Sequence, residues 1–302
     1  MKVTVKAPGS CGELAQGTID GENFLITCPI NVYSKVRVSA VQDSSQQLGP
    51  KVISAMRKTL AYLNLTEQDF QLGITSQLPL GKGMASSSAD ISATCQSIAL
   101  AAGRELTPDE IADIALSIEP TDGIFYPGIM LFDHIHGRIR QYLGKALPMH
   151  IAVFDVGGEI DTLHFNQRFD LHELNKANEG KMKEAVNFIR QGLANEDISL
   201  IGKGATMSAL ANQTILFKPD LEEIITISLA MGGVGVNIAH SGTVVGVLFP
   251  TEHVKYSSAC IEEISSRCNT VRYLRTVEFI SGGLLKQEGD YNEWTHCSSS
   301  WR

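Results

Sequence analysis

With 302 residues, of which 43% are hydrophobic and 19% charged, the chain is long enough to bury a sizeable core as one large or two modest domains. Its net charge of −8, with 25 lysines and arginines scattered along the sequence, argues against a nucleic-acid partner. The 6 cysteines form no Cys-x-x-Cys pair, so neither a zinc site nor a thioredoxin motif is expected. Neither a secretion signal nor an apolar stretch of bilayer length occurs, which predicts a cytoplasmic protein without a membrane partner.

The first part of the chain shows strand-like spacing of apolar residues. Residues 3–6 and 34–39 alternate between polar and apolar side chains, and residues 24–29 form a short apolar run, which together predict an antiparallel sheet. Residues 51–63 have helical periodicity, and residues 70–75 are typical of another strand. A sheet with helices packed on it is therefore expected in this region.

Residues 78–90 contain the most informative motif, a glycine and serine loop that opens into an apolar helix ending near Gly103. Gly81 and Gly83 allow the backbone to curl closely, and the serines at 86–88 add hydroxyls for phosphate oxygens or Mg²⁺. Because backbone amides at a helix N-terminus bind anions, the motif predicts a nucleotide phosphate site. A branched side chain at Gly83 should then block ATP and leave the fold largely intact. Taken alone, these residues also fit a plain serine-capped helix.

Other nucleotide-binding fingerprints are missing from the sequence. The Gly-Lys-Gly run at 202–204 lacks the hydroxyl and the spacing of a Walker motif, and the run at 232–235 lacks the third glycine of a dinucleotide loop. No His-Arg-Asp or Asp-Phe-Gly string of the protein kinases occurs. A P-loop, Rossmann or protein-kinase fold is therefore not expected.

Further helices and strands are predicted along the rest of the chain. Thr107, followed by Pro108 and two acids, is a typical helix start, and this helix should end near residue 118. Alternation at 133–136 predicts a strand before the turn at Gly137, which explains the two histidines there better than a metal site does. The chain then predicts strands at 149–155, 243–249 and 276–280 and helices at 172–191, 197–212, 221–229 and 254–267.

A change of character near Pro148 suggests where the chain divides. We expect an N-terminal domain over residues 1–148, which contains the phosphate loop, and a second α+β domain over residues 149–286. Residues 287–302 are polar and are expected to form a loosely held tail.

Three motifs, in this order along the chain, resemble those of the GHMP small-molecule kinases. They lie at residues 6–17, 79–89 and 232–243, and the central one is similar to the family's phosphate loop, usually written Pro-x-x-x-Gly-Leu-Gly-Ser-Ser-Ala. Ala85 departs from the pattern, because most relatives have a third glycine there. Within the family, the segments at 8–14, 27–30, 118–123 and 239–243 together resemble the L-threonine kinase branch, which acts in cobalamin synthesis.

The resemblance implies an α+β, two-domain GHMP kinase fold with a ribosomal-protein-S5-like N-terminal domain and a ferredoxin-like C-terminal domain. It also implies ATP as the phosphate donor and Mg²⁺ as a cofactor. The glycines of the third motif would allow that segment to approach the phosphate loop closely. The residues expected to bind ATP are Pro79, Gly81, Lys82, Gly83, Met84, Ala85, Ser86, Ser87, Ser88, Gly233, Gly235 and Ser241.

Carboxylates are the next candidates, because phosphoryl transfer needs Mg²⁺ and a positioned acceptor. Glu119 lies at a helix end before Pro120, and the resemblance implies that it coordinates Mg²⁺ together with Ser87. Asp122 is expected in the catalytic site, where it either deprotonates or only orients the acceptor hydroxyl. Glu13 would bind the ammonium group of an amino-acid acceptor. Each of these carboxylates also fits a solvated helix end or a surface turn.

The resemblance implies an enzyme that uses ATP to phosphorylate the side-chain hydroxyl of L-threonine, which gives O-phospho-L-threonine. A kinase for homoserine or another small hydroxylated metabolite is the main alternative. A non-catalytic nucleotide-binding regulator is disfavoured because Ser87 and Glu119 are both present, and a diphosphomevalonate-type decarboxylase because no cation cluster is evident. His240 beside Ser241 lacks a nucleophile elbow, so a hydrolase dyad is not expected. Homodimer formation stays open.

Overall fold

The computed structural model describes residues 2–39, 48–65, 70–158, 165, 168–288 and 294–297. Its strands are β1 (Lys2–Ile19), β2 (Glu22–Ser39), β3 (Gln71–Ser76), β4 (Ile129–Phe132), β5 (Arg140–Gly144), β6 (Met149–Asp155), β7 (Gly235–Ile238), β8 (Val244–Pro250), β9 (Arg272–Glu278), β10 (Leu285–Glu288) and β11 (Thr295–His296). They form one sheet in the order β5-β4-β2-β1-β7-β8-β6-β9, to which β3 adds on β2, β10 on β1 and β11 on β10.

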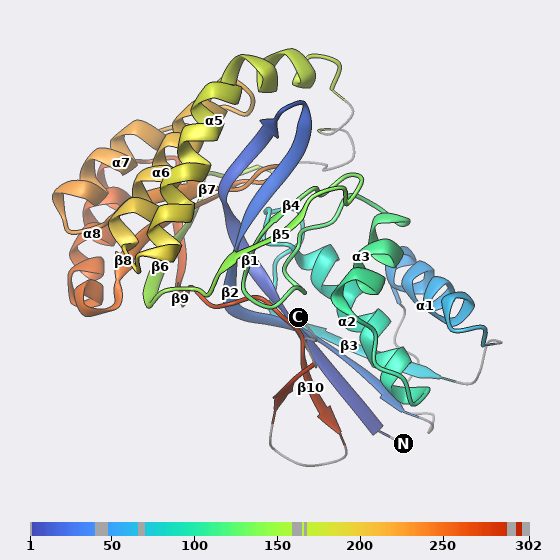
Figure 1. The fold of residues 1–302 in the computed structure, drawn as a ribbon. Coiled ribbons are helices and arrows are strands. Elements are labelled where there is room, and N and C mark those ends of the chain that lie inside the picture. Colours follow the sequence, from blue (N-terminus) through green and yellow to red (C-terminus); the bar gives the residue numbers. More distant parts are fainter. Residues whose placement is uncertain are drawn as a thin grey trace.

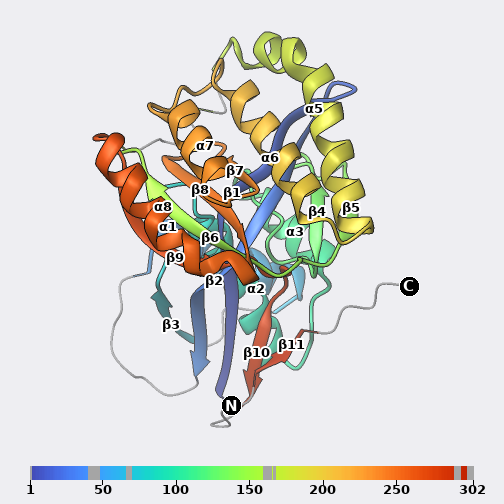
Figure 2. The same ribbon diagram turned by 90° about the vertical axis from the view of Figure 1, so that its left-hand side faces the viewer.

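Two groups of helices cover different parts of this sheet (Figure 1). The helices are α1 (Pro50–Tyr62), α2 (Ser86–Ala101), α3 (Pro108–Leu116), α5 (Leu171–Ala194), α6 (Ile198–Asn212), α7 (Leu221–Ala230) and α8 (Val254–Arg267), with a 3₁₀ turn at Thr251–His253. Helix α2 packs on β1 and β2, α6 packs on β1 and β7, and α8 contacts β6, β8 and β9 (Figure 2). No helix in the described ranges is long and apolar enough to cross a membrane.

Two clusters of buried apolar side chains form the core. The larger cluster fills the space between α1, α2, α3 and the β1–β2 hairpin, and it extends to α5 and α6 through Ile189 and Ile201. The second lies between α7, α8 and the strands β6 to β8, with Phe154 and Phe249 at its centre. The sheet therefore carries both helical groups on one continuous framework.

The β1–β2 hairpin runs from one helical group to the other (Figure 1), and it confirms the predicted antiparallel sheet. Its pairing shifts between Pro8 and Gly9 and again on both sides of Glu13. Such bulges bend a strand and redirect its side chains. At the bend, Glu13 is paired both with Thr27 of β2 and with Ile238 of β7. The first motif is thus placed where the two halves of the sheet meet.

The helices lie close to their predicted ranges. The helix start at Thr107 is confirmed as a capping box, in which Glu110 N–H donates to Thr107 Oγ1 at 3.3 Å and Thr107 N–H donates to Glu110 Oε2 at 2.7 Å. Strand β9 begins at Arg272, earlier than the predicted strand at 276–280.

The segment at 133–136 corrects the sequence prediction, because it is a turn between β4 and β5 and not a strand. The Asp133 carboxylate accepts hydrogen bonds from the backbone N–H groups of Ile135, His136 and Arg138, at 3.0 to 3.1 Å. A carboxylate that binds its own following backbone favours a turn over an extended chain. Part of the expected loose tail also differs, because β10 pairs with β1 and with β11.

Candidate active site

The loop between β3 and α2 holds the glycine and serine motif. Gly81, Gly83 and Ala85 have φ angles of 70°, 78° and 56°, so the chain curls through left-handed conformations before α2 begins. Ala85 adopts the conformation for which glycine is preferred. It is the N-cap residue, and no side chain caps the helix, which contradicts the serine-capped alternative. The N–H groups of the first turn are therefore available to an anion.

Segment 239–243 closes against this loop. The N–H groups of Thr243 and Val244 donate to the Lys82 carbonyl at 3.0 and 3.2 Å, and Gly242 lies so close to Gly83 that a Cβ on either residue would collide with the other segment. The close approach that the third motif predicted is therefore present, and Gly242 makes it possible.

Two details of the third motif differ from expectation. Gly233 packs against Ser228 at the end of α7, and Gly235 packs against Gly202 of α6, so neither glycine lies at the phosphate loop. Gly233 precedes β7 and Gly235 begins it, whereas only the far end of β7 leads to the segment that meets the loop.

Gly83, in the central motif, also differs from expectation. A Cβ on Gly83 would point toward Ala239, so a branched side chain there would displace the closing segment and would not leave the fold intact.

Ser87 and Glu119 meet at the mouth of the loop. Ser87 Oγ donates a hydrogen bond to Glu119 Oε1, and Lys51 Nζ lies 2.5 Å from Glu119 Oε2. A hydroxyl and a carboxylate that share a hydrogen bond are within reach of one small cation. Mg²⁺ prefers oxygen ligands and is usually held by one or two protein groups together with phosphates. This pair therefore fits Mg²⁺.

Asp122 lies beside the pair, in contact with the next serine. Ser88 Oγ lies 3.2 Å from Asp122 Oδ2 and accepts a hydrogen bond from Asp122 N–H at 3.0 Å. Burial raises the pKa of Asp122 to about 6, the Ser88 hydrogen bond lowers it, and the charge of Glu119 raises it further. A carboxylate whose pKa lies near neutrality can accept a proton during catalysis.

Glu13 is a third carboxylate of the site, buried on the bent part of β1. Burial raises the pKa of Glu13 well above its usual range, and the charge of Asp122 adds to this shift. A hydrogen bond from the His240 backbone and the positive charge of Lys218 act in the opposite direction. Glu13 is therefore a carboxylate held in low-dielectric surroundings, where a cation from a ligand would stabilise its charged form.

These residues line one cavity of about 920 Å³. Of the residues predicted for the site, the ones that line it are Glu13, Gly81, Gly83, Met84, Ala85, Ser86, Ser87, Ser88, Glu119, Asp122 and Ser241. Pro79, Lys82, Gly233 and Gly235 are not among its lining residues. Lys82 instead directs its ammonium to Asp155 Oδ2 at 3.0 Å and to the Gly158 carbonyl at 2.7 Å, at the end of β6.

Several lining residues were missed in the sequence. Lys51 is a lone lysine at a helix start, and no motif marks it. His134 and His240 come from separate turns, and their rings pack edge to face with 4.9 Å between the centroids. Burial lowers the pKa of His134 to about 4, and burial followed by the charges of His134 and Lys218 lowers the pKa of His240 well below its usual range. Both rings are therefore neutral at physiological pH.

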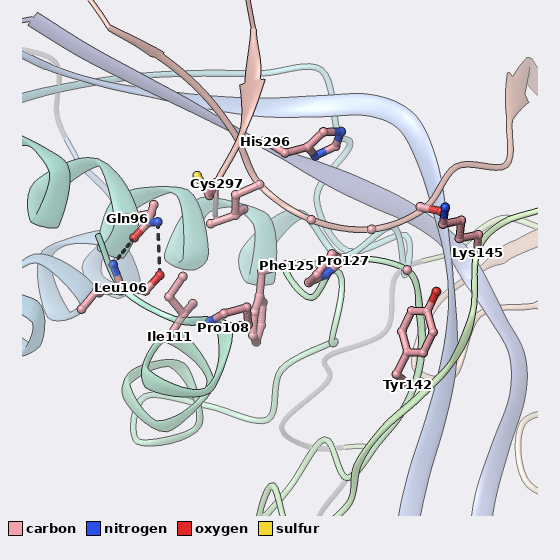
Figure 3. Close-up of a pocket in the computed structure, with 15 residues that line it drawn as sticks. Gln96, Leu106, Pro108, Ile111, Phe125, Pro127, Tyr142, Lys145, His296 and Cys297 are labelled. Carbon is pink, nitrogen blue, oxygen red and sulfur yellow. Dashed lines mark hydrogen bonds between the residues drawn. The ribbon is translucent and has the colours of Figure 1, made fainter. Parts of the chain in front are cut away.

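A second cavity of about 600 Å³ lies near the start of α3, β5 and the chain before β10 (Figure 3). Its lining is mainly apolar, and its Gln96 side chain is engaged with the Leu106 backbone through hydrogen bonds of 3.0 and 3.3 Å (Figure 3). Active sites bring together polar groups that a ligand can use. The cavity with the phosphate loop is therefore the candidate active site.

Comparisons of sequence agree with this geometry. The family called GHMP kinases N terminal domain matches residues 50–126, and the family called GHMP kinases C terminal matches residues 189–256. The chain is 30% identical over 245 residues to the L-threonine kinase of Citrobacter freundii, which covers 80% of this chain and 85% of that protein. The L-threonine kinase of Salmonella typhimurium is also 30% identical, over 80% of this chain and 81% of its own length.

Solved structures of the same family share the fold. A mevalonate kinase aligns with a TM-score of 0.66 at 19% identity, over 92% of this chain and 99% of its own. The homoserine kinase of Cytophaga hutchinsonii aligns with a TM-score of 0.67 at 18% identity, over 95% of this chain and 97% of its own. The expected α+β GHMP kinase fold is thereby confirmed. The chain belongs to the GHMP kinases and is an ATP-dependent small-molecule kinase.

Proposed function

We propose that this kinase transfers the γ-phosphoryl group of ATP to the side-chain hydroxyl of L-threonine. The observation that carries the proposal is the meeting of three acids, Glu119, Asp122 and Glu13, around one cavity that begins at the phosphate loop. The identity to two L-threonine kinases supports the choice of acceptor. The acceptor oxygen forms a bond to phosphorus, the bond from phosphorus to the β,γ-bridging oxygen breaks, and ADP leaves.

In this proposal the phosphates of ATP lie against the loop from Gly81 to Ser88, and the N-terminus of α2 supplies N–H donors and a positive dipole end. Ser87 and Glu119 would hold Mg²⁺, which neutralises charge on the phosphate oxygens during transfer. Lys51 is held beside Glu119 at 2.5 Å and adds a positive charge at the same edge. Gly242, by its close approach, keeps the loop in this shape.

Asp122 and Glu13 would position the acceptor. Asp122 contacts Ser88, next to the phosphate loop, so its carboxylate would orient the acceptor hydroxyl and take its proton. Glu13 is buried and would bind the acceptor's ammonium. The proposal extends to a cytoplasmic enzyme whose product enters cobalamin nucleotide-loop synthesis as a precursor of aminopropanol phosphate, which is supported by the resemblance of residues 8–14 and 239–243.

The experiment compares kcat/KM for L-threonine, L-serine, L-homoserine and L-threonine amide with Mg-ATP, in an assay coupled to ADP release. Threonine should be the best acceptor. Serine lacks one methyl group and should be weaker by roughly 1 to 3 kcal/mol in transition-state binding. A higher kcat/KM for homoserine would overturn the acceptor and leave the kinase assignment unchanged. If no hydroxylated amino acid reacts, the amino-acid acceptor class is wrong.

A further inference from the structure

Lys218 is a buried lysine that none of the motifs contains. It lies in the loop between α6 and α7 and is 1% exposed, although its neighbour Phe217 is 70% exposed. The Gln213 side chain fixes its backbone on both sides, because Oε1 accepts from Lys218 N–H at 2.7 Å and Nε2 donates to the Lys218 carbonyl at 3.0 Å. Its Nζ finds no hydrogen-bond partner among the described residues. A buried ammonium group is unfavourable unless a polar partner joins it.

Glu13 is a buried group of the opposite charge, and it also has an atom without a partner among the described residues. Its Oε2 is buried and likewise lacks a hydrogen-bond partner within the described part of the chain. Burial lowers the pKa of Lys218 to about 8, and the nearby charge of Glu13 acts against this shift. Lys218 in turn acts against the upward shift that burial causes in the pKa of Glu13. They are nevertheless not bonded to each other. Two buried, opposite and unsatisfied charges fit a ligand that carries both charges itself.

Gln16 contacts the cavity wall through His240, and neither Gln16 nor Lys218 is itself among the cavity's lining residues. His240 lines the cavity, and the charge of Lys218 lowers its pKa. His240 Nδ1 lies 2.8 Å from Gln16 Oε1, and Gln16 Nε2 is a third buried atom that has no partner in the described structure. The Lys218 ammonium and the Gln16 amide are both donors, which is what a carboxylate requires.

We infer that Lys218, together with Gln16, binds the α-carboxylate of the acceptor, while Glu13 binds its α-ammonium group. The inference rests on the proposed function and specifies how that function selects its substrate. Because Glu13 and Lys218 would then hold both charged groups, the side-chain hydroxyl is the group left to reach Asp122 and the phosphate loop. The acceptor is then a free amino acid, and a threonine whose carboxylate is blocked, as in an amide or a peptide, is rejected.

The test is a comparison of L-threonine with L-threonine amide in the wild type and in Lys218→Met. Wild type should favour threonine in kcat/KM by at least about 100-fold, because the amide leaves a buried ammonium unpaired. Lys218→Met should lower kcat/KM for threonine by a similar factor, change the value for the amide less than about 3-fold, and leave the KM for ATP unchanged. Lys203→Met is the matched control, since Lys203 is exposed on α6 with its Nζ 3.9 Å from the centre of the Phe188 ring.

Each outcome separates the inference from the function on which it rests. If Lys218→Met is folded by its melting temperature and reduces both acceptors equally, or neither, the inference is wrong and the threonine kinase assignment stands. Lys218→Gln, measured in the same way, replaces Lys218→Met if the latter does not fold. Wild type that uses the amide as well as threonine also overturns the inference, whatever the variants do. Wild type that neither phosphorylates L-threonine nor binds it in calorimetry removes the proposed function and this inference together.

Discussion

The two ends of the cavity differ in how their polar groups are satisfied. At the phosphate end, Ser87 is bonded to Glu119 and Ser88 to Asp122, so the side chains hold one another in place before any ligand arrives. The second region, the inner end, consists of Glu13, which lines the cavity, and Lys218, which does not. Glu13 Oε2 and Lys218 Nζ are both buried without partners among the described residues. Preorganised groups favour charge development in the transition state, whereas unsatisfied groups favour discrimination between ligands. In the proposed function, rate therefore depends on one region and specificity on the other.

Glu119→Gln tests the phosphate end and should have the largest effect. The amide loses the negative charge that would hold Mg²⁺ and that faces Lys51, so kcat should fall on the order of 10²- to 10³-fold. The dissociation constant of ATP should change much less, because charge stabilisation is realised mainly in the transition state. Steady-state kinetics over a Mg²⁺ series and calorimetry with ATP measure the two quantities.

Glu22→Gln is the control for that variant, because Glu22 pairs with Arg138 on the surface and should leave kcat unchanged. Ser87→Ala should lower kcat in the same direction as Glu119→Gln. Wild-type turnover of Glu119→Gln at saturating Mg²⁺ would show that this carboxylate holds no catalytic metal.

The phosphate end was also the part that the sequence predicted best. Gly81 and the serines from Ser86 to Ser88 lie in one short stretch of the chain, so their spacing alone placed them at a loop before a helix. The same argument failed for Gly233 and Gly235, because the sequence does not say which glycine of a motif meets the loop. That choice depends on where β7 ends, which follows from its pairing with β8.

Glu13→Gln tests the inner end and should affect specificity more than rate. The amide cannot balance the charge of an ammonium group, so the KM for threonine should rise by about 10- to 100-fold, with a smaller change in kcat. The acceptor 3-hydroxybutyrate, which lacks the ammonium group, should respond little to this change. If 3-hydroxybutyrate and threonine lose activity equally in Glu13→Gln, the carboxylate has a structural role.

Most of the inner end could not be predicted, because its residues come from distant parts of the chain. Glu13 lies on β1 between two register shifts, His134 in the turn after β4 and Lys218 after α6. No spacing rule connects them. His134 was assigned to a strand because alternation over a few residues resembles one, whereas the Asp133 carboxylate folds the segment into a turn.

His134 offers a test that depends on pH, since its ring is buried and lines the cavity. Its pKa is lowered by burial from 6.5 to about 4, so the unfolded chain binds the proton more tightly. The stability contributed by the neutral ring is therefore present above pH 6.5 and is lost as the pH falls toward 4.

The free energy of unfolding of wild type relative to His134→Gln should decrease by about 2 kcal/mol between pH 7 and pH 5. Urea unfolding at both pH values measures this difference. His136→Gln is the control for the substitution itself, because His136 is exposed in the same turn. A difference between wild type and His134→Gln that stays constant with pH would mean that folding does not change the pKa of His134.

Ala85→Gly should have the smallest effect and tests how the phosphate loop is held. Ala85 has a φ of 56°, and this conformation costs an alanine about 1 to 2 kcal/mol relative to a right-handed one. Glycine removes that strain but has more freedom to lose on folding, so Ala85→Gly should stabilise the protein by up to about 1 kcal/mol, with ATP affinity unchanged. The reverse change at Gly21, which has a φ of 79° and open space where a Cβ would lie, is the matched control, and Gly21→Ala should destabilise by about 1 kcal/mol. Loss of both stability and ATP affinity in Ala85→Gly would show that the methyl group, and not the backbone curl alone, holds the loop in its phosphate-binding shape.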